Sequence, residues 1–428
     1  MKIELRYGRG VVPVTVPEGL QCTIIRKGSS RPLADPHQAI ERVFDAPIGA
    51  APLETVARGK KSACILICDV TRPVPNHLFL QPLIRRLIGA GIPAEAITVL
   101  VATGLHRPNE GEELARLVGD PWVLETVRVV NHFARNDADH ADLGRTRRRG
   151  TPVKVDRRFV EAELRIATGL VEPHFMAGYS GGRKVVAPGI CHADVIRTFH
   201  SARFMEDPNV IECNLVDNAL HEEQLEVVRM IGDILALNTV VNEERELIHV
   251  TFGAIVESHL AAVRFVEEFV RIPVPRRFKT VVTSSAGYPL DENYYQTVKG
   301  MVTPLSILEP GGTLIIASAC PRGLGSEEFR ASQRRLLAIG PDAFMKSILA
   351  KSMADIDEWQ SEMYLKARRV GMIQLFTDGL SAEDRTLTGV EVIDDVDAAV
   401  RASVAASGDR AIAVIPEGPY VVPKYVAA

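Results

Sequence analysis

Short apolar runs rich in β-branched residues recur along the chain, and each is followed by a polar or glycine-rich loop and then by an amphipathic stretch. Continuous apolar strands that alternate with helices are typical of a mainly parallel sheet that is buried on both faces. The pattern therefore predicts an α/β protein. The expected strands are residues 64–68, 97–102, 164–168, 280–283, 313–317, 371–376 and 411–415, and the expected helices are 77–87, 215–231 and 254–270. The pattern Asn109-x-x-Glu112 also predicts a capped helix start.

A proline-rich segment predicts a domain boundary. The helix expected over 254–270 runs into Ile272-Pro-Val-Pro-Arg-Arg277, where two prolines restrict the backbone, and a new strand is expected at about residue 280. We therefore expect a linker here and two α/β domains, with the active site in the cleft between them. The predicted limits are 1–272 for the first domain, 273–410 for the second, and 411–428 for a terminal strand that returns to the first.

Composition narrows the class of protein. The 428 residues suffice for two or three domains, and 50 Lys+Arg against 54 Asp+Glu give no basic excess, which argues against a nucleic-acid partner. The run 145–149 is basic but lacks aromatic residues, so it is interpreted as a solvated loop. The six cysteines form no CxxC pair, and no apolar run approaches ~18 residues. We expect a cytoplasmic protein that does not bind membranes.

Polar side chains follow several of the predicted strands. Asp69 and Arg72 come after the first strand, His106 after the second, and Glu172 and His174 after the third. A Gly-Tyr-Pro-Leu-Asp segment, 287–291, follows the first strand of the second domain. Because ligands of open α/β sheets bind beyond the carboxyl ends of the strands, these loops predict a site at that edge.

The densest polar segment runs from His174 to Lys184 and contains Gly181, Gly182 and Arg183. Backbone amides in a glycine-rich turn can cradle an anion, and the adjacent cations can pair with it. The alternative is a plain turn with a solvated Arg-Lys pair. The chain lacks a GxxxxGK[ST] loop, and no GxGxxG follows the first strand, which disfavours an ordinary dinucleotide dehydrogenase.

The histidines in these loops suggest acid–base chemistry. His106 and His174 both follow strands, and a pair of imidazoles on opposite sides of a substrate can remove and return a proton. A structural histidine is the alternative for each, and His200 is interpreted as either a helix cap or a metal ligand. Gln296 and Lys299 are three residues apart on an expected helix and, with Arg72, would form a carboxylate clamp; a solvated helix start is the alternative.

Taken together and in order, these motifs resemble the nickel-pincer-nucleotide-dependent lactate racemase family. The resemblance runs from about residue 60 to 360. The motifs that carry it are Asp69-Val-Thr-Arg72-Pro, Ala102-Thr-Gly-Leu-His106-Arg, Glu172-Pro-His174, Gly181-Gly182-Arg183-Lys184, His200-Ser, Gly287-Tyr-Pro-Leu-Asp291, Tyr295-Gln296-x-x-Lys299-Gly and Trp359.

The resemblance implies a cofactor and a role for each residue. A pyridinium-derived mononucleotide that holds nickel would be attached covalently to Lys184, with His200 as the protein's metal ligand. His106 and His174 would be the catalytic acid/bases. The substrate would be held by Arg72, Tyr295, Gln296 and Lys299, and the cofactor site would be lined by Asp69, Ser180, Gly181, Gly182 and Trp359.

The resemblance also implies a reaction: racemisation or epimerisation of lactate or a related 2-hydroxy acid, by reversible hydride transfer to the cofactor through a 2-oxo acid. Cofactor-synthesis enzymes would be transient partners. Substrate selectivity is expected near Tyr294, Tyr295, Phe175 and Met176, while Cys191 and His192 are interpreted as packing or as modifiers of the metal environment. The alternatives are a non-catalytic cofactor carrier and a nicotinamide-dependent 2-hydroxy acid oxidoreductase.

Overall fold

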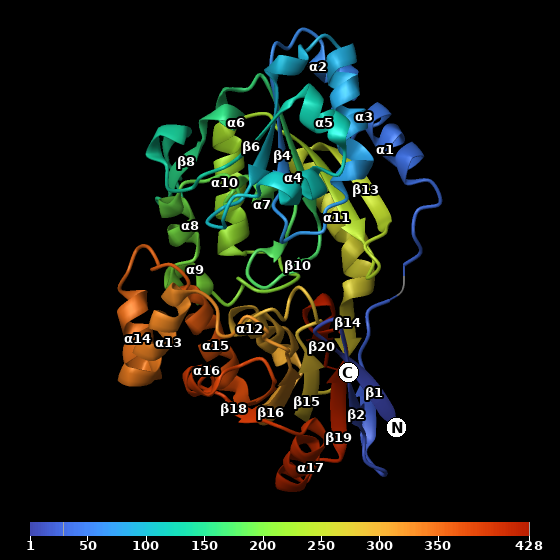
Figure 1. The fold of residues 1–428 in the computed structure, drawn as a ribbon. Helices are drawn as coiled ribbons and strands as arrows, with labels where there is room; N and C mark the ends of the chain where they lie inside the picture. The colour runs from blue at the N-terminus through green and yellow to red at the C-terminus, as the bar shows by residue number, and fades with distance from the viewer. Residues whose placement is uncertain (29, 428) are drawn as a thin grey trace. The chain divides into compact units, whose positions relative to one another are not determined.

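The computed structural model describes residues 1–28 and 30–427, which form two compact units (Figure 1). The larger unit contains residues 30–199 and 207–268, and the smaller unit contains residues 1–28, 200–206 and the chain from Phe269 onward. Each unit is built around a six-stranded sheet with helices, so the predicted α/β class with mainly parallel sheets is confirmed. Segments 1–28 and 200–206, which fall within the predicted first domain, and the terminal segment predicted to return to that domain belong to the smaller unit.

The sheet of the larger unit has the order β13-β12-β9-β4-β5-β6. All neighbouring strands are parallel except β13, which is antiparallel to β12. The strands are β4 (Ala63–Cys68), β5 (Ile97–Ala102), β6 (Arg128–Asn131), β9 (Leu164–Leu170), β12 (Leu235–Val241) and β13 (Leu247–Ala254). Two small antiparallel pairs accompany it, β7 (His140–Arg145) with β8 (Pro152–Asp156) and β10 (Pro173–His174) with β11 (Gly178–Tyr179).

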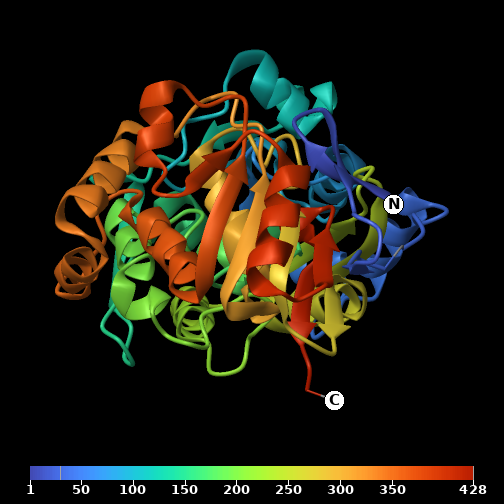
Figure 2. The same ribbon diagram turned by 90° about the horizontal axis from the view of Figure 1, so that it is seen from below.

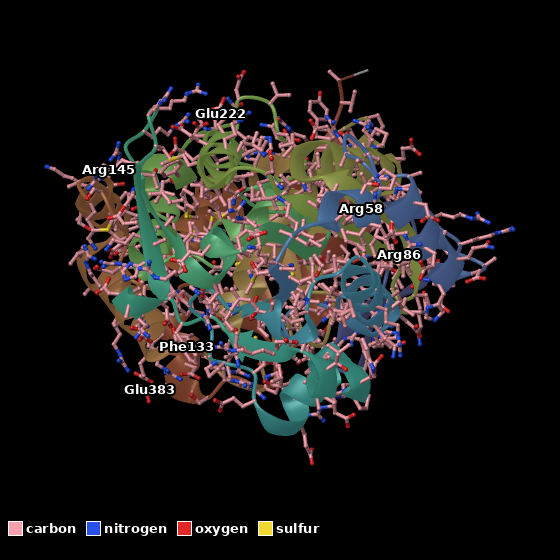
Figure 3. The ribbon with its side chains drawn as sticks, turned by 90° about the horizontal axis from the view of Figure 1, so that it is seen from above. Arg58, Arg86, Phe133, Arg145, Glu222 and Glu383 are labelled. Carbon is pink, nitrogen blue, oxygen red and sulfur yellow. The ribbon has the colours of Figure 1, made fainter. Side chains whose placement is uncertain are left out.

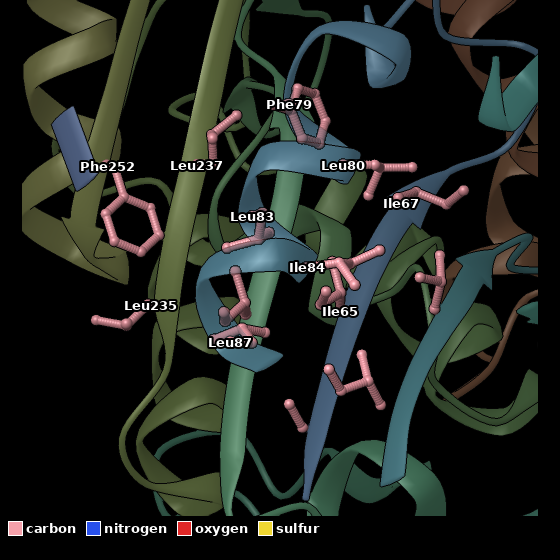
Figure 4. Packing of buried hydrophobic residues seen from close by; sticks show 14 of the residues in the cluster. Ile65, Ile67, Phe79, Leu80, Leu83, Ile84, Leu87, Leu235, Leu237 and Phe252 are labelled. Carbon is pink, nitrogen blue, oxygen red and sulfur yellow. The ribbon is translucent and has the colours of Figure 1, made fainter. Parts of the chain in front are cut away.

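Helices pack against this sheet through continuous apolar faces. Figure 4 shows Leu83 and Leu87 of α3 against Ile65 of β4 and Leu235 of β12, and each of these side chains is buried. Burial of one such side chain contributes roughly 1.5–3 kcal/mol, so this face fixes the strands that carry the polar loops. The helices of this unit are α1 (Pro36–Asp45), α2 (Leu53–Ala57), α3 (Asn76–Gly89), α4 (Gly111–Val118), α5 (Pro121–Thr126), α6 (Arg157–Glu161), α7 (Arg183–Val186), α8 (Ala193–Phe199), α10 (Ala219–Ile231) and α11 (Ile255–Val270).

The sheet of the smaller unit is entirely parallel, with the order β18-β17-β16-β15-β19-β3. Helix α17 packs on β15 and β16 and is seen in red in front of the sheet in Figure 2. The strands are β3 (Gln21–Ile24), β15 (Phe278–Ser284), β16 (Leu308–Ala317), β17 (Gly371–Phe376), β18 (Glu391–Ile393) and β19 (Ala411–Ile415). The helices are α9 (Ala202–Met205), α12 (Tyr294–Val302), α13 (Glu327–Ile339), α14 (Pro341–Leu349), α15 (Glu358–Val370), α16 (Ala382–Leu387) and α17 (Val396–Ser407).

Two further strand pairs belong to the smaller unit. A hairpin of β1 (Lys2–Tyr7) and β2 (Gly10–Thr15) starts the chain, and β14 (Arg271–Val274) pairs in parallel with β20 (Val422–Tyr425). The segment that the prolines predict as a linker therefore begins as a paired strand. Its backbone hydrogen bonds run to the C-terminal end of the chain, which a local sequence pattern does not reveal.

Two local predictions have clear outcomes. A helix does start in the predicted region, but the cap at Asn109 is wrong: α4 begins at Gly111, and the buried Asn109 side chain accepts a bond from the Val70 amide at 3.3 Å. The basic run 145–149 pairs with α10, because Arg148 and Arg149 both contact Glu222, at 2.5 and 3.1 Å. Figure 3 labels Glu222 and Arg145, the first residue of this run. Among the described residues, no helix is both long and apolar enough to cross a membrane.

Candidate active site

The polar loops of the larger unit lie at one edge of its sheet. Strands β9, β4 and β5 are adjacent and parallel, so the loops that follow them leave the same edge. The edge thus brings together Asp69 and Arg72 after β4, His106 after β5, and Glu172 after β9, as the sequence predicts. The 69–72 loop is held by Asn109 and by a bond from the Arg72 amide to the Asp69 carbonyl at 3.1 Å.

Asp69 and His106 form a hydrogen-bonded pair. The distance from Asp69 Oδ2 to His106 Nδ1 is 2.6 Å, while Asp69 Oδ1 accepts bonds from the Thr71 hydroxyl at 2.6 Å and its amide at 3.2 Å. Burial raises the pKa of Asp69, but His106, Thr71 and Arg72 together outweigh this effect and hold that pKa below its usual range. The carboxylate is buried and ionised, and the His106 side chain is 61% exposed. This arrangement fixes the imidazole through one nitrogen and presents the other to solvent.

Arg72 is paired within its own unit. Its Nη1 donates to Glu172 Oε1, and the two side chains are 29% and 19% exposed. Glu172 belongs to the motif that ends in His174, but the sequence gives it no partner. The signal that identifies it is its place: it follows β9, and β9 is a neighbour of the strand that precedes Arg72.

His174 is buried, and its Nδ1 accepts two backbone bonds. The amides of Met176 and Ala177 lie 3.3 and 3.2 Å from this nitrogen, and the ring stacks on Phe175 with centroids 4.8 Å apart. A nitrogen that accepts N–H bonds carries a lone pair and no proton. Its environment therefore differs from that of His106, whose Nδ1 faces a carboxylate.

The glycines of the 180–184 segment are required by close packing. A Cβ on Gly181 would lie 2.6 Å from Val171, and one on Gly182 would lie 2.7 Å from His259, and both residues have positive φ angles of 76° and 49°. The Ser180 hydroxyl donates to the carbonyl of Leu170 at 2.7 Å. The turn is thus pressed against the end of β9.

The backbone amides of this turn are already in use. Gly182 donates to Asn238 Oδ1 at 3.0 Å, Lys184 to the Gly181 carbonyl at 3.0 Å, and Val185 to the Gly182 carbonyl at 3.1 Å. The expectation that the turn's amides cradle an anion is therefore wrong for these three amides. The turn positions Lys184 by internal bonds instead.

Arg183 is a buried structural cation, so the expectation that it pairs with a bound anion is wrong. It is 1% exposed, and it donates to the carbonyls of Ala177 at 2.7 Å and Tyr179 at 3.0 Å. Its Nε donates to His221 Nδ1 at 2.9 Å, and the Nη1 that binds the Tyr179 carbonyl also lies 3.0 Å from His259 Nε2. Burial lowers the pKa of Arg183 to about 9 and that of His221 to about 3, so His221 is a neutral acceptor at pH 7.

Lys184 lies in the single turn of α7 and is half-buried. The charge of Lys184 acts on Cys68, the last residue of β4, so Lys184 lies near this end of the strand. Burial raises the pKa of the Cys68 thiol to about 11, while the charges of Arg72 and Lys184 act to lower it. Both cations therefore act electrostatically on the end of β4.

The smaller unit holds the other predicted site residues. His200 packs against Trp359, with ring centroids 4.6 Å apart and the ring planes tilted by 40°, and the Trp359 indole donates to the Tyr295 hydroxyl at 2.9 Å. Burial and a bond to Asp357 raise the pKa of Tyr295, so the phenol stays neutral. Tyr294, by contrast, is fully buried and donates to the Thr388 carbonyl at 2.7 Å, so its hydroxyl is committed to the core.

Gln296 and Lys299 both lie on α12 and are half-buried. The amide of Gln296 caps the helix by donating to Asn293 at 3.0 Å. Its side-chain Oε1 is shielded from solvent and finds no hydrogen-bond donor among the described residues. A buried polar atom without a partner is a position where a bound ligand can supply the missing bond.

Cys191 and His192 belong to the packing around α8. Cys191 is fully buried and donates to the Val186 carbonyl at 3.5 Å, while His192 contacts Asp137 at 3.2 Å and Asp194 at 3.5 Å. In the part of the chain that the structure describes, no group of three or more His, Cys, Asp or Glu side chains is arranged to hold a metal.

Comparison with known proteins places this geometry in a family. Residues 7–212 match the lactate racemase N-terminal domain, and residues 275–422 match the lactate racemase C-terminal domain. Lactate racemase of Lactiplantibacillus plantarum is 31% identical over 391 residues, covering 90% of this chain and 91% of the relative. Lactate racemase of Thermoanaerobacterium thermosaccharolyticum is 30% identical over 428 residues, covering 98% of each chain.

Solved structures agree with these matches. The lactate racemase apoprotein from T. thermosaccharolyticum has a TM-score of 0.91 at 28% identity and covers 99% of this chain and 100% of its own. A protein from Thermotoga maritima has a TM-score of 0.63 at 18% identity, covers 93% of this chain and 100% of its own, and shares the fold alone.

Proposed function

This chain belongs to the lactate racemase family, whose named members are isomerases, and we propose that it interconverts the enantiomers of a 2-hydroxy acid, with lactate as the first candidate. The observation that carries the proposal is the carboxylate-held histidine, His106 with Asp69, at the strand edge that also holds Arg72. A cofactor carrier would need Lys184 and His200 but not this pair.

The two catalytic histidines are proposed to start in complementary states. His106 Nδ1 carries the proton that bonds to Asp69, which leaves a lone pair on Nε2 to accept a proton from the substrate hydroxyl. His174 Nδ1 accepts two amide bonds, which places its single proton on Nε2, where it can hydrogen-bond to the substrate oxygen; to return a proton, the ring must first take up a second one. Racemisation requires one group that removes the hydroxyl proton and a second that returns one, and we propose His106 for the first role and His174 for the second.

The family resemblance implies a nickel-pincer nucleotide, and the donor chemistry of this chain fits it at two positions. Lys184 offers an amine for covalent attachment, and His200 offers an imidazole, a ligand type that suits nickel. When bound, the group supplies a site that takes up the α-hydride of the substrate and gives it back. Ser180, Gly181 and Gly182 would adjoin the attachment point, and Trp359 would support the metal ligand.

Binding of the substrate carboxylate is proposed for Arg72, Gln296 and Lys299. The planar guanidinium of Arg72 suits bidentate pairing, and a substrate carboxylate there would compete with Glu172 for it. The partnerless Oε1 of Gln296 would accept a hydrogen bond from the bound substrate. Tyr295 is proposed to act beside them, although its hydroxyl already accepts a bond from Trp359.

The test is racemisation by matured protein, co-produced with the cofactor-synthesis enzymes that we propose as transient partners in the cytoplasm. Pure L-lactate should yield D-lactate, followed by chiral chromatography, and Lys184→Ala should abolish this conversion because the amine is lost. If pure enantiomers of lactate and of a panel of other 2-hydroxy acids all keep their optical purity, the proposal fails.

A further inference from the structure

Helix α15 presents four side chains to the segment that carries His200. Trp359, Glu362, Lys366 and Arg369 follow one another at spacings of three, four and three residues, so they share one face of the helix. Segment 200–206, which includes α9, lies against this helix within the smaller unit (Figure 1). The helix and the segment are far apart in the sequence: Lys366 and Met205, which are in contact, are separated by 161 residues.

Each of the four side chains contacts this segment. The Trp359 ring packs against His200, with ring centroids 4.6 Å apart, and the Lys366 amine donates to the carbonyl of Met205. Arg369 Nη1 lies 2.7 Å from Glu206 Oε2, which is an ion pair at the end of the segment. Glu362 is 1% exposed, and its carboxyl group faces Glu206 closely enough for a hydrogen bond between them to raise its pKa.

A hydrogen bond between two carboxyl groups requires a proton. The Oε1 atoms of both Glu362 and Glu206 are buried, and neither has a hydrogen-bond donor among the described residues. Two ionised carboxylates in contact repel each other, and a shared proton removes the repulsion and supplies a donor. This contact therefore favours the protonated form of Glu362 when the segment lies as in this structure.

We propose that Glu362 is a positioning residue, which as a neutral acid fastens segment 200–206 to α15 and so keeps His200 against Trp359. The role of His200 as metal ligand rests on the proposed function, whereas the anchoring contact itself does not. Lys366 and Arg369 bind the same segment, and Glu362 adds the one bond that depends on a proton.

The charged groups that face Glu362 determine the pH at which this bond is lost. Burial, the Coulomb effect of Glu206 and the bond to it raise the pKa of Glu362 to about 9, while Lys366 and Arg369 lower it. Glu362 is thus protonated at pH 7. Above about pH 9 both carboxyl groups carry charge, and their repulsion loosens the segment.

The experiment reads the surroundings of Trp359 without any need for cofactor. The chain has two tryptophans, so Trp122→Phe leaves Trp359 as the only one. Protein made without the cofactor and labelled with 5-fluorotryptophan then gives a single ¹⁹F resonance for the indole that contacts His200. In this background the resonance should move with a midpoint near pH 9.

Three substitutions test the assignment. Glu362→Gln keeps the shape and an N–H donor for Glu206, so the pH 7 resonance should stay in place and the transition near pH 9 should vanish. Glu362→Ala should shift or broaden the resonance already at pH 7. Asp384→Asn is the matched control, because Asp384 is a buried carboxylate of the same unit that pairs with Arg330, and it should leave the transition unchanged.

Persistence of the transition in Glu362→Gln, or an unchanged pH 7 resonance in Glu362→Ala, would overturn the assignment. Racemisation is assayed separately on matured protein. An inactive protein that shows the ¹⁹F transition would therefore refute the proposed function but support the anchoring role of Glu362. An active protein without the transition would refute the anchoring role and support the proposed function.

Discussion

The pair formed by Asp69 and His106 makes the sharpest prediction, through the substitution Asp69→Asn. Thr71 donates its hydroxyl proton to Asp69 Oδ1 at 2.6 Å, and it would donate to the oxygen of the new amide in the same way. The amide NH₂ would then face His106 Nδ1, which lies 2.6 Å from Oδ2 in the structure. His106 must accept that bond, so its own proton moves to Nε2. The nitrogen that should act as the base is then blocked.

Two effects determine how much Asp69→Asn slows racemisation. Two unit charges 4 Å apart near a protein surface interact by about 4 kcal/mol, but the 61% exposure of His106 reduces the loss of this attraction to roughly 1 kcal/mol, or about fivefold in rate. The tautomer effect is larger, since an Asp to Asn change behind a catalytic histidine costs up to about 10⁴-fold in serine proteases. Because the exposed ring of His106 can partly reorient, we expect a decrease of roughly 10²- to 10⁴-fold.

The assay compares variants that carry equal amounts of cofactor, as measured by intact mass. Conversion of L-lactate to D-lactate is followed by chiral chromatography. Thr71→Val is the control, because it removes one bond to Asp69 but keeps the carboxylate, and it should lower the rate by less than about tenfold. A rate for Asp69→Asn equal to that of the unsubstituted protein, or loss of the cofactor in place of a slower reaction, would refute the orienting role.

Three further predictions concern the metal, the glycine turn and acid stability. His200→Ala should keep the adduct on Lys184 but lose nickel, as checked by intact mass and elemental analysis; nickel at the unsubstituted level would show that another group holds the metal. Gly182→Ala should lower the free energy of unfolding by roughly 2–4 kcal/mol and Tm by several degrees, because its Cβ would lie 2.7 Å from His259 at a φ of 49°. Gly408→Ala is the control, since open space surrounds it, and should lower the free energy of unfolding by only about 1 kcal/mol. Equal Tm values for the two variants would contradict this. Asp156→Asn tests a buried ion pair. Burial raises the pKa of Asp156, but bonds from Arg158 and His132 outweigh this effect and lower that pKa. The pair therefore contributes about 3 kcal/mol to the free energy of unfolding above the unfolded pKa of about 4, and this contribution is lost as pH falls through the folded pKa. Urea unfolding should show the difference at pH 7 and little of it near pH 2, and an equal difference at both would refute the linkage.

Much of the fold could be predicted from the sequence because buried parallel strands are continuous apolar runs. The runs 97–102, 371–376 and 411–415 coincide with β5, β17 and β19. Strand β3 could not be found this way, since three of its four residues are exposed or polar at the sheet edge. Segments 1–28 and 200–206 belong to the smaller unit because they contact residues that are distant in the sequence, and no local sequence pattern encodes such contacts.

The site was predictable to the extent that it depends on strand ends. Asp69 and His106 meet because β4 and β5 are parallel neighbours, and their loops leave the same edge. The pairing of Arg72 with Glu172 could not be predicted, since strand order is not visible in one sequence. The buried role of Arg183 was equally hidden, because a Gly-Gly-Arg-Lys run has the same letters whether its arginine points to solvent or to the core.

The central claim, that this chain is a racemase whose cofactor is attached to Lys184, is tested most directly by denaturing intact-mass spectrometry with peptide mapping. The sample is racemising protein from its own host or co-produced with the cofactor-synthesis enzymes. We predict an adduct of mononucleotide size on the peptide that contains Lys184. An unmodified Lys184 in protein that racemises a 2-hydroxy acid would contradict the account.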